Sequence, residues 1–120
     1  MTTSLYARLA ARFPDAGKTF LETVDGRVIT YGALQAESAR MAGALVKLGV
    51  KPGDRVAVQV SKSPEALVLY LGCVRAGAVY LPLNTAYTMA ELGYFIGDAE
   101  PTVVVCDPKS REAVSALPEA

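Results

Sequence analysis

The length, composition and charge of the chain place it among globular proteins and exclude several functions. Its 120 residues are 52% apolar and 20% charged, so we expect one unit with a real core rather than a disordered chain. Twelve basic and twelve acidic side chains cancel, which removes the attraction behind nucleic-acid or anionic-membrane binding, and the lack of histidine excludes a Ser-His-Asp triad.

The N-terminal segment is predicted to form an amphipathic helix. Leu5, Leu9 and Phe13 recur every four residues, and Pro14 stops the pattern. Two arginines and no acid among the first fourteen residues are a bias that mitochondrial transit peptides share, but an ordinary helix accounts for it. The longest apolar stretch, Ala66 to Val74, is far too short to cross a bilayer. We therefore expect a soluble, cytoplasmic protein.

A β-hairpin and a long helix are predicted next. Phe20 to Val24 and Arg27 to Tyr31 are β-prone runs, and the Asp25-Gly26 pair between them suits a two-residue hairpin turn. From Leu34 to Leu48, mostly apolar residues recur at helical spacing, with Thr30 as the N-cap candidate. This spacing predicts a helix of about five turns.

The rest of the chain alternates strands and helices. The predicted elements are a strand at 55–60, a helix that begins at Ser63-Pro64 and ends at Gly77, a strand at 78–83, a helix from Thr88 to about Asp98, a strand at 102–106, and a last helix from Asp107-Pro108 through Leu117. The first of these helices, from Ser63-Pro64 to Gly77, is apolar on every face around 66–74 and should be buried on most sides. Pro82 should mark a strand end or a free edge, and the strand at 102–106 should be covered on both faces.

This order of elements predicts the fold class. Strands that alternate with helices form a parallel sheet with right-handed crossovers and flanking helices. We therefore predict an α/β fold with an N-terminal β-hairpin. Cys73 and Cys106 form no Cys-x-x-Cys pair, so we expect two buried free thiols in a reducing compartment, with a disulfide as the alternative.

Two segments contain residues that could take part in chemistry, but a plainer reading of each is favoured. Asp15-Ala16-Gly17-Lys18-Thr19 contains the end of a phosphate loop, but Arg12 replaces the required first glycine, and the segment joins a helix to a hairpin. Asp98 and Glu100 are close enough in sequence for a carboxylate pair, yet they lie at a helix end beside Pro101. A chance partial match to the motif is the favoured interpretation of the first segment, and solvated turn residues are the favoured interpretation of Asp98 and Glu100.

The loop from Asn84 to Tyr87 is the best site candidate. It follows the carboxyl end of a predicted parallel strand, where open α/β sheets bind ligands. Loop polarity and the capping residue Thr88 explain the same residues without a ligand, and this interpretation is favoured.

Three blocks of sequence carry a family resemblance. They are Thr30-Tyr31-Gly32-Ala33-Leu34, then Leu48-Gly49-Val50-Lys51-Pro52-Gly53-Asp54-Arg55-Val56, then Arg75-Ala76-Gly77-Ala78-Val79-Tyr80-Leu81-Pro82-Leu83. In this order and spacing they resemble the N-terminal domain of adenylate-forming acyl-CoA synthetases, the AMP-binding enzyme family, nearly from end to end. Within that family, the segment Leu81 to Thr88, followed by Glu91-Leu92 and Tyr94-Phe95, looks most like malonyl-CoA synthetases.

The resemblance implies a reaction in two steps. A carboxylate, here malonate, attacks ATP to give an acyl-adenylate and pyrophosphate, and the thiol of CoA then displaces AMP; Mg2+ accompanies the ATP. In this family the phosphate loop, the adenine-binding segment, the magnesium-binding glutamate and the C-terminal lysine all follow the region matched here, and the chain ends at Ala120 before any of them.

Residues 1–120 are therefore expected to be a partial N-terminal domain, inactive alone and completed by the remainder of the synthetase. No catalytic, cofactor-binding or metal-binding residue is assigned to the chain. The alternatives are another adenylate-forming ligase, with the same opening blocks, and a non-catalytic α/β interaction module.

Overall fold

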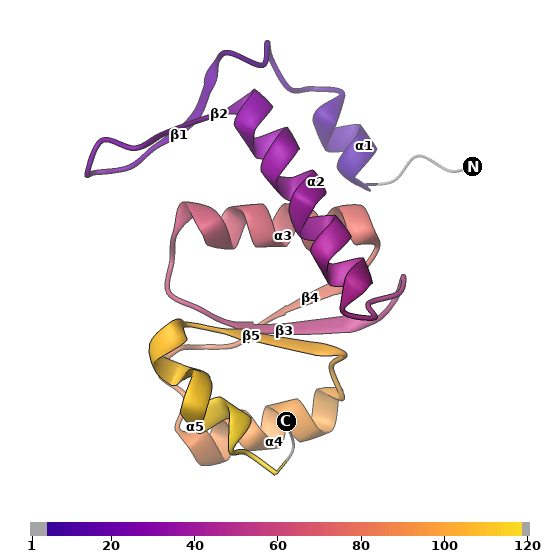
Figure 1. The fold of residues 1–120 in the computed structure, drawn as a ribbon, viewed down its shortest axis with the longest axis vertical. Helices are drawn as coiled ribbons and strands as arrows, with labels where there is room; N and C mark the ends of the chain where they lie inside the picture. Colours follow the sequence, from indigo (N-terminus) through magenta and orange to yellow (C-terminus); the bar gives the residue numbers. More distant parts are fainter. Residues whose placement is uncertain (1–4, 119–120) are drawn as a thin grey trace.

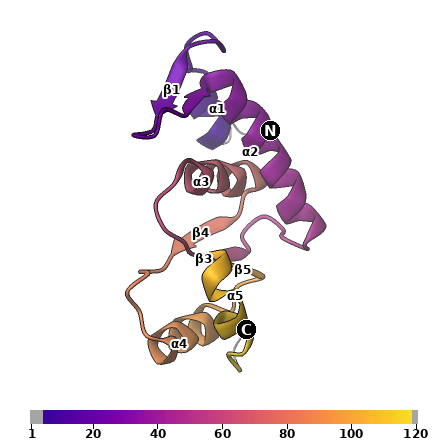
Figure 2. The same ribbon diagram turned by 60° about the vertical axis from the view of Figure 1, so that its left-hand side comes forward.

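The computed structural model describes residues 5–118 and arranges them in layers. The elements are α1 (Leu5–Ala10), β1 (Thr19–Glu22), β2 (Val28–Thr30), α2 (Tyr31–Lys47), β3 (Arg55–Gln59), α3 (Pro64–Ala76), β4 (Val79–Pro82), α4 (Met89–Ala99), β5 (Val103–Cys106), the 3-10 helix η1 (Pro108–Ser110) and α5 (Arg111–Ser115). Figure 1 shows α3 on one side of the β3–β5 sheet and α4 and α5 on the other, with α2 crossing α3. In the turned view of Figure 2, the hairpin and α1 lie beyond α3, far from α4.

The main sheet is parallel, with the strand order β4-β3-β5. Val56 in β3 pairs with Tyr80 on one side and with Val103 on the other. β1 and β2 form a separate antiparallel hairpin. The predicted α/β fold, with its parallel sheet, flanking helices and N-terminal hairpin, is confirmed.

The core lies on both faces of β3, because successive side chains of a strand point to opposite faces. Val56 and Val58 pack on the α2–α3 side with Leu45, Leu69 and Cys73. On the opposite side, Ala57 packs against four residues from the β4 end, α4 and α5, which are Leu83, Leu92, Ile96 and Val114. Each face of the sheet is thus covered by a pair of helices.

The two long helices begin at the predicted caps. The Thr30 hydroxyl accepts a hydrogen bond from the amide of Ala33, and the Ser63 hydroxyl accepts one from the amide of Ala66. Gly77 ends α3 in the left-handed conformation, at a φ of 74°. The hydroxyls of Thr30 and Ser63 satisfy amides that the first turn of a helix leaves without partners.

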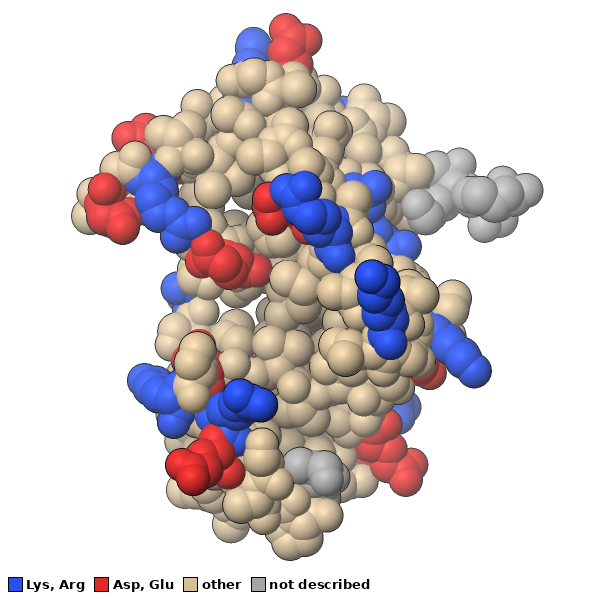
Figure 3. All heavy atoms as spheres, viewed as in Figure 1, with Lys and Arg blue, Asp and Glu red and all other residues tan. Residues whose placement is uncertain are grey.

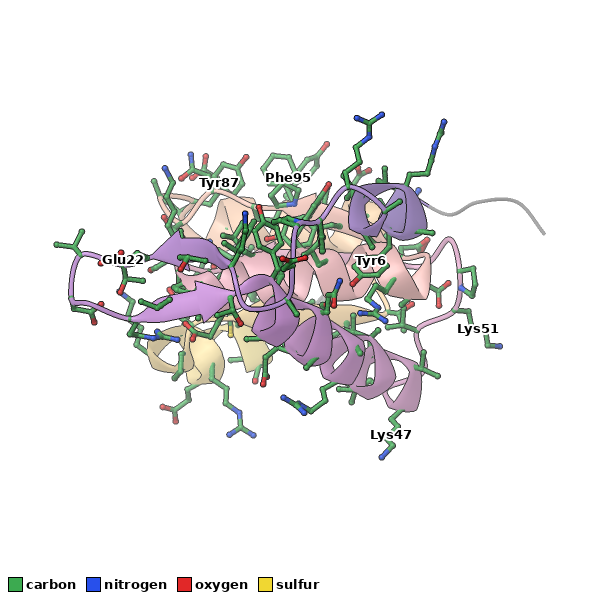
Figure 4. The ribbon with its side chains drawn as sticks, turned by 90° about the horizontal axis from the view of Figure 1, so that it is seen from above. Tyr6, Glu22, Lys47, Lys51, Tyr87 and Phe95 are labelled. Atoms are coloured by element: carbon green, nitrogen blue, oxygen red, sulfur yellow. The ribbon has the colours of Figure 1, made fainter. Side chains whose placement is uncertain are left out.

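One arginine joins three helices. The Nη1 of Arg75, near the end of α3, donates to the Tyr6 hydroxyl at 3.0 Å, to the Gln35 carbonyl at 2.9 Å and to the Ser38 hydroxyl at 3.2 Å. Its guanidinium carbon also lies 4.1 Å from the centre of the Tyr6 ring, within cation–π range. Figure 4 shows Tyr6 beside the helices it contacts. The α1 helix, which has no buried residue of its own, is held to the fold through this contact.

The prediction of a two-residue hairpin turn was wrong. The amide of Thr23 donates to the Arg27 carbonyl at 2.8 Å, and the amide of Gly26 donates to the Thr23 carbonyl at 3.0 Å, so residues 24–26 form the loop. Gly26 has a φ of 92°, whereas Asp25 does not have the positive φ of a two-residue type I′ turn. The Thr23 hydroxyl, which accepts from the Arg27 amide at 2.9 Å, stabilises the longer loop.

Two predictions for the helices need correction. The α3 helix is buried on most sides around 66–74, as predicted, but one face is open, because Leu67 and Tyr70 are 41% and 40% exposed. The last helix is split into η1 and α5 and ends at Ser115, before Pro118, rather than at Leu117. The Asp107 carboxylate makes no cap for this helix and instead accepts hydrogen bonds from Ser61, which lies 46 residues away in the sequence.

The strand at 102–106 also differs from its prediction. Side chains of β5 pack against the core on both faces of the sheet, as predicted, but all four residues are only half-buried, because β5 lies at an edge of the sheet. The Cα radius of gyration is 15.4 Å, whereas a compact domain of this length has a value of about 13.6 Å. Within residues 5–118, no helix has both the length and the apolar character that crossing a membrane requires.

Close packing of α2 on α3 leads to a prediction about Gly72. A Cβ atom at this position would lie 2.6 Å from Met41 Cγ and 2.8 Å from Met41 Cβ, so the helices would have to separate. We expect Gly72→Ala to lower the free energy of unfolding by about 1–3 kcal/mol. In the matched control, Gly43→Ala, the new methyl group meets nothing within 4 Å in α2 and should stabilise the helix by about 0.5–1 kcal/mol. Urea denaturation followed by circular dichroism measures both, and equal shifts would refute the close contact.

The buried thiol leads to a prediction about pH. Both cysteines are free, which confirms that expectation, although Cys106 is only half-buried while Cys73 is 0% exposed. Burial raises the pKa of Cys73 from 9.0 to about 11, because the thiolate would lose its hydration. The folded state therefore binds this proton more tightly, and stability should fall as the pH rises from about 9 through about 11.

At pH 8, iodoacetamide should modify Cys106 well before Cys73; equal rates, resolved by mass spectrometry, would contradict this packing.

Candidate functional site at the carboxyl edge of the sheet

The carboxyl ends of the three parallel strands meet at one edge of the sheet. Gln59 ends β3 and Ser61 follows it, Asn84 follows β4, and Asp107 follows β5. The loop from Asn84 to Tyr87 lies where its prediction placed it, beyond the carboxyl end of a parallel strand. In open α/β sheets this edge is the usual place for ligands, so its geometry decides what the chain can do.

Hydrogen bonds fix the loop that begins at Asn84. The Asn84 side-chain oxygen accepts from the amide of Ala86 at 2.8 Å, and the backbone carbonyl of Asn84 accepts from the amide of Tyr87 at 3.1 Å. The same carbonyl accepts from the buried Gln59 side chain at 3.0 Å. The polar groups of Asn84 and Gln59 therefore connect the ends of β4 and β3.

The far end of the loop is held by stacking and by a helix cap. The Tyr87 and Phe95 rings stack with centres 4.9 Å apart, and Figure 4 shows them side by side. The amide of Thr88 donates to the Glu91 carboxylate at 2.9 Å, and the amide of Glu91 donates to the Thr88 hydroxyl at 3.2 Å. This is the predicted capping box, and it confirms the structural interpretation of Thr88.

A second bond network connects the ends of β3 and β5. The Asp107 carboxylate accepts from the Ser61 hydroxyl at 2.9 Å and from the Ser61 amide, at 3.2 Å to each oxygen. This serine–aspartate pair has no histidine to complete a nucleophilic triad, because the chain contains none. It therefore braces the edge of the sheet.

The edge as a whole offers few groups for chemistry. Within the described part of the chain, every buried side-chain nitrogen and oxygen has a hydrogen-bond partner. Among the same residues, no cluster of acidic or cysteine side chains could hold a metal ion. The hydrogen bonds of this edge hold the strand ends together.

The other predicted candidates lie away from this edge. The segment 15–19 leads from the turn after α1 into β1, which begins at Thr19. The amide of Lys18 donates to the Asp15 carbonyl, and the Lys18 carbonyl accepts from the amide of Tyr31. Asp98 and Glu100 are both exposed at the end of α4, and Glu100 takes the left-handed C-cap conformation at a φ of 49°. The structure brings none of these segments to the carboxyl edge.

Sequence reasoning missed an apolar groove between the hairpin and α3. It encloses about 680 Å³ and is lined by Leu21, Leu67, Tyr70 and Tyr80, among others. Figure 3 shows the surface hollowed below the hairpin, with charged side chains of both signs scattered around it. The apolar residues on every face of α3 were the signal for this groove. Its walls suit packing against other apolar groups rather than catalysis.

Comparison with known proteins identifies the family. A model of the AMP-binding enzyme family matches residues 6–120, so the chain belongs to that family. This confirms the resemblance seen in the sequence, in which the chain corresponds to the N-terminal segment of acyl-CoA synthetases.

Particular relatives point in the same direction. The crystal structure of apo MatB from Rhodopseudomonas palustris matches 98% of this chain with a TM-score of 0.91 and 55% sequence identity. Acetyl-coenzyme A synthetase 1 of Candida albicans is 41% identical over 75% of this chain, and feruloyl-CoA synthase of an Amycolatopsis species is 38% identical over 77%. The chain spans 23% of MatB and 13% and 19% of the two synthetases, respectively.

The serine–aspartate pair leads to a prediction about stability. Asp107→Ala should lower the free energy of unfolding by about 1–2 kcal/mol, because the Ser61 amide and hydroxyl lose a charged acceptor. Asp98→Ala removes an exposed acid at a helix end and should change stability by less than about 0.5 kcal/mol. Chemical denaturation compares the two variants, and a loss no larger for Asp107→Ala than for Asp98→Ala would show that the pair is not a brace.

Proposed function

We propose that this chain is the N-terminal part of an ATP-dependent carboxylate–CoA ligase whose substrate is malonate. The observation that carries the proposal is the 55% identity to MatB, a malonyl-CoA synthetase, over 98% of this chain. Solved ligases named for other carboxylates share less sequence: anthranilate CoA ligase AuaEII is 25% identical and a benzoate CoA ligase from Burkholderia xenovorans LB400 is 29% identical.

The proposed reaction has two steps. A carboxylate oxygen of malonate attacks the α-phosphorus of ATP and releases pyrophosphate, and the thiol of CoA then displaces AMP from the malonyl-adenylate to give malonyl-CoA. Mg2+ would accompany the ATP. An ATP-bound structure of MatB supports the use of this nucleotide.

ATP and Mg2+ do not fit the groups that this chain presents. Within residues 5–118, no set of acidic side chains could hold the metal ion, and the Gly-Lys-Thr segment lies in a turn between a helix and a hairpin rather than between a strand and a helix. We therefore assign no step of the reaction to these residues. Their proposed role is to support the sheet of a larger domain.

The shape of the molecule supports its assignment as a partial domain. Its radius of gyration of 15.4 Å exceeds the compact value of about 13.6 Å, and the groove beside α3 leaves apolar side chains exposed. We propose that the remainder of the synthetase packs on these surfaces, and that the ligase is a cytoplasmic enzyme that binds small carboxylates, without nucleic-acid or membrane partners.

A second candidate function is the activation of a different carboxylate. The acetyl-coenzyme A synthetase and the feruloyl-CoA synthase match this chain at 41% and 38% identity, so the same scaffold occurs in relatives named for other acyl groups. A third candidate, a non-catalytic α/β module, would retain the scaffold without the chemistry.

The decisive experiment compares substrates on the protein encoded by the complete gene. AMP release is measured with ATP and CoA and with malonate, acetate or ferulate as the acid. We expect malonate to have a kcat/KM at least about tenfold above the others, because a tenfold ratio requires only about 1.4 kcal/mol of differential transition-state binding. Preference for another acid would replace malonate, and no turnover with any acid would favour the module.

The 120-residue chain serves as the control for this experiment. It should release no pyrophosphate above a protein-free blank, because the phosphate loop of this family follows the region matched here. Activity that survives repurification would place catalytic groups within this segment and overturn the assignment of a scaffold role.

A further inference from the structure

The central strand of the sheet ends in a buried polar residue. Residues 56–58 of β3 are apolar and buried, as a strand covered on both faces requires, but the next residue, Gln59, is only 6% exposed. Among residues 5–118, Gln59 and Ser38 are the two buried polar residues. Burying a carboxamide costs free energy unless hydrogen bonds compensate, so the partners of Gln59 indicate what this residue does.

The Gln59 carboxamide is only partly used within this chain. Its nitrogen donates to the Asn84 backbone carbonyl at 3.0 Å, and no hydrogen bond to its oxygen occurs within the described part of the chain. Because a carbonyl can only accept, the nitrogen must face Asn84 and the oxygen is turned away from it. Every buried side-chain oxygen among the described residues has a partner, so the Gln59 oxygen must reach the surface at the end of the sheet.

The bond to Asn84 does not explain why this residue is polar. The Asn84 carbonyl also accepts from the amide of Tyr87 at 3.1 Å, so it would keep a partner if Gln59 were replaced. An apolar side chain of similar length would avoid the cost of burying a carboxamide. Stability alone would therefore be served equally well by an apolar residue at position 59.

Gln59 lies where the connections of neighbouring strands diverge. The chain leaves β3 towards α3 on one face of the sheet, whereas it leaves β4 and β5 towards α4 and α5 on the other face (Figure 1). Because side chains alternate along a strand, Gln59 points to the same face as Ala57, which is the α4–α5 face. Its carboxamide thus lies between the ends of β4 and β5, and its own loop turns to the opposite face. In open α/β sheets, ligands bind at such a switch point.

We propose that Gln59 is a positioning residue of the ligase, an inference that rests on the proposed function. Its nitrogen fixes the loop from Asn84 to Tyr87, and its oxygen accepts a hydrogen bond from the remainder of the synthetase. The carboxamide thereby joins the end of the central strand to the groups that perform the chemistry. The oxygen binds neither malonate nor the phosphates of ATP, because ionised carboxylates and phosphates, like the oxygen itself, only accept hydrogen bonds.

The test uses the protein encoded by the complete gene. Gln59→Met replaces the carboxamide by an apolar side chain of similar length, and kcat for AMP release should fall at least about tenfold, because a displacement of about 1 Å can cost this much at a reacting centre. The KM values for the acid, ATP and CoA should stay within about threefold of the parent, since Gln59 touches no substrate. The preference for malonate over acetate should not change.

Gly72→Ala is the matched control. It disturbs the packing of α2 on α3, away from the carboxyl edge. It should lower the melting temperature more than Gln59→Met does and keep kcat within about threefold of the parent. A merely structural role for Gln59 would give the reverse order, with stability lost and kcat kept. Parental kcat in a folded Gln59→Met enzyme, or an equal loss of kcat in Gly72→Ala, would refute the proposal.

If Gln59→Met does not fold, Gln59→Asn provides the second variant. It keeps the carboxamide but withdraws it by one methylene group from its partners. Its kcat should fall at least about fivefold, because the loop and the remainder of the synthetase are no longer held in register. A folded Gln59→Asn enzyme with parental kcat would overturn the proposal.

Hydrogen exchange separates failure of this inference from failure of the proposed function. The amides of Ala86 and Tyr87 donate to Asn84, and in the complete protein they should exchange at least about tenfold faster in Gln59→Met than in the parent. If the parent turns over no acid, the proposed function fails, and the exchange rates alone decide whether Gln59 positions the loop. Unchanged exchange of both amides would refute the positioning role whatever the activity.

Discussion

The position of β3 determines the rest of the structure. Its backbone is hydrogen-bonded to β4 on one side and to β5 on the other. Val56 and Val58 are buried under α2 and α3, and Ala57 is buried under α4 and α5. A parallel strand in this position must be apolar on both faces, because helices cover both. The four helices of the two outer layers are therefore arranged around this one strand.

The N-terminal elements depend on the first helical layer rather than on the sheet. The α1 helix and the hairpin contain no fully buried residue, so they cannot form a core of their own. Contacts of three kinds attach them. Arg75 binds Tyr6, Tyr31 packs between Phe13 and Phe20 with ring centres at 5.0 and 5.3 Å, and Arg27 forms an ion pair with Glu65 at 2.6 Å. The ion pair is exposed and contributes little, so the aromatic cluster and Arg75 provide most of the attachment.

Elements with local signals could be predicted from the sequence. Thr30 and Ser63 cap their helices, Thr88 forms its capping box, and Pro82 ends an edge strand, because each feature depends on residues within one turn of chain. The hairpin loop could not be predicted in the same way. Asp25-Gly26 suits loops of two or three residues, and the hydroxyl of Thr23 selects the longer one.

Features that depend on distant partners were also missed. The split of the last helix follows from the bond between Asp107 and Ser61, which are 46 residues apart. The exposure of Leu67 and Tyr70 on α3, and the half-burial of β5, depend on which neighbours the fold supplies. For the candidate site, the sequence correctly placed the loop from Asn84 to Tyr87 beyond a strand end. It could not show that Gln59 binds the carbonyl of Asn84, because that contact joins the ends of two strands.

Polar groups at the carboxyl edge are used to join strand ends: Gln59 binds Asn84, and Ser61 binds Asp107. Side chains committed to such internal bonds hold a sheet in place but leave little to distinguish one carboxylate from another. MatB and the anthranilate ligase match this chain with TM-scores of 0.91 and 0.86, although their identities to it are 55% and 25%. In the proposed ligase, selection of the acid would then depend on groups that this scaffold positions rather than on the scaffold itself.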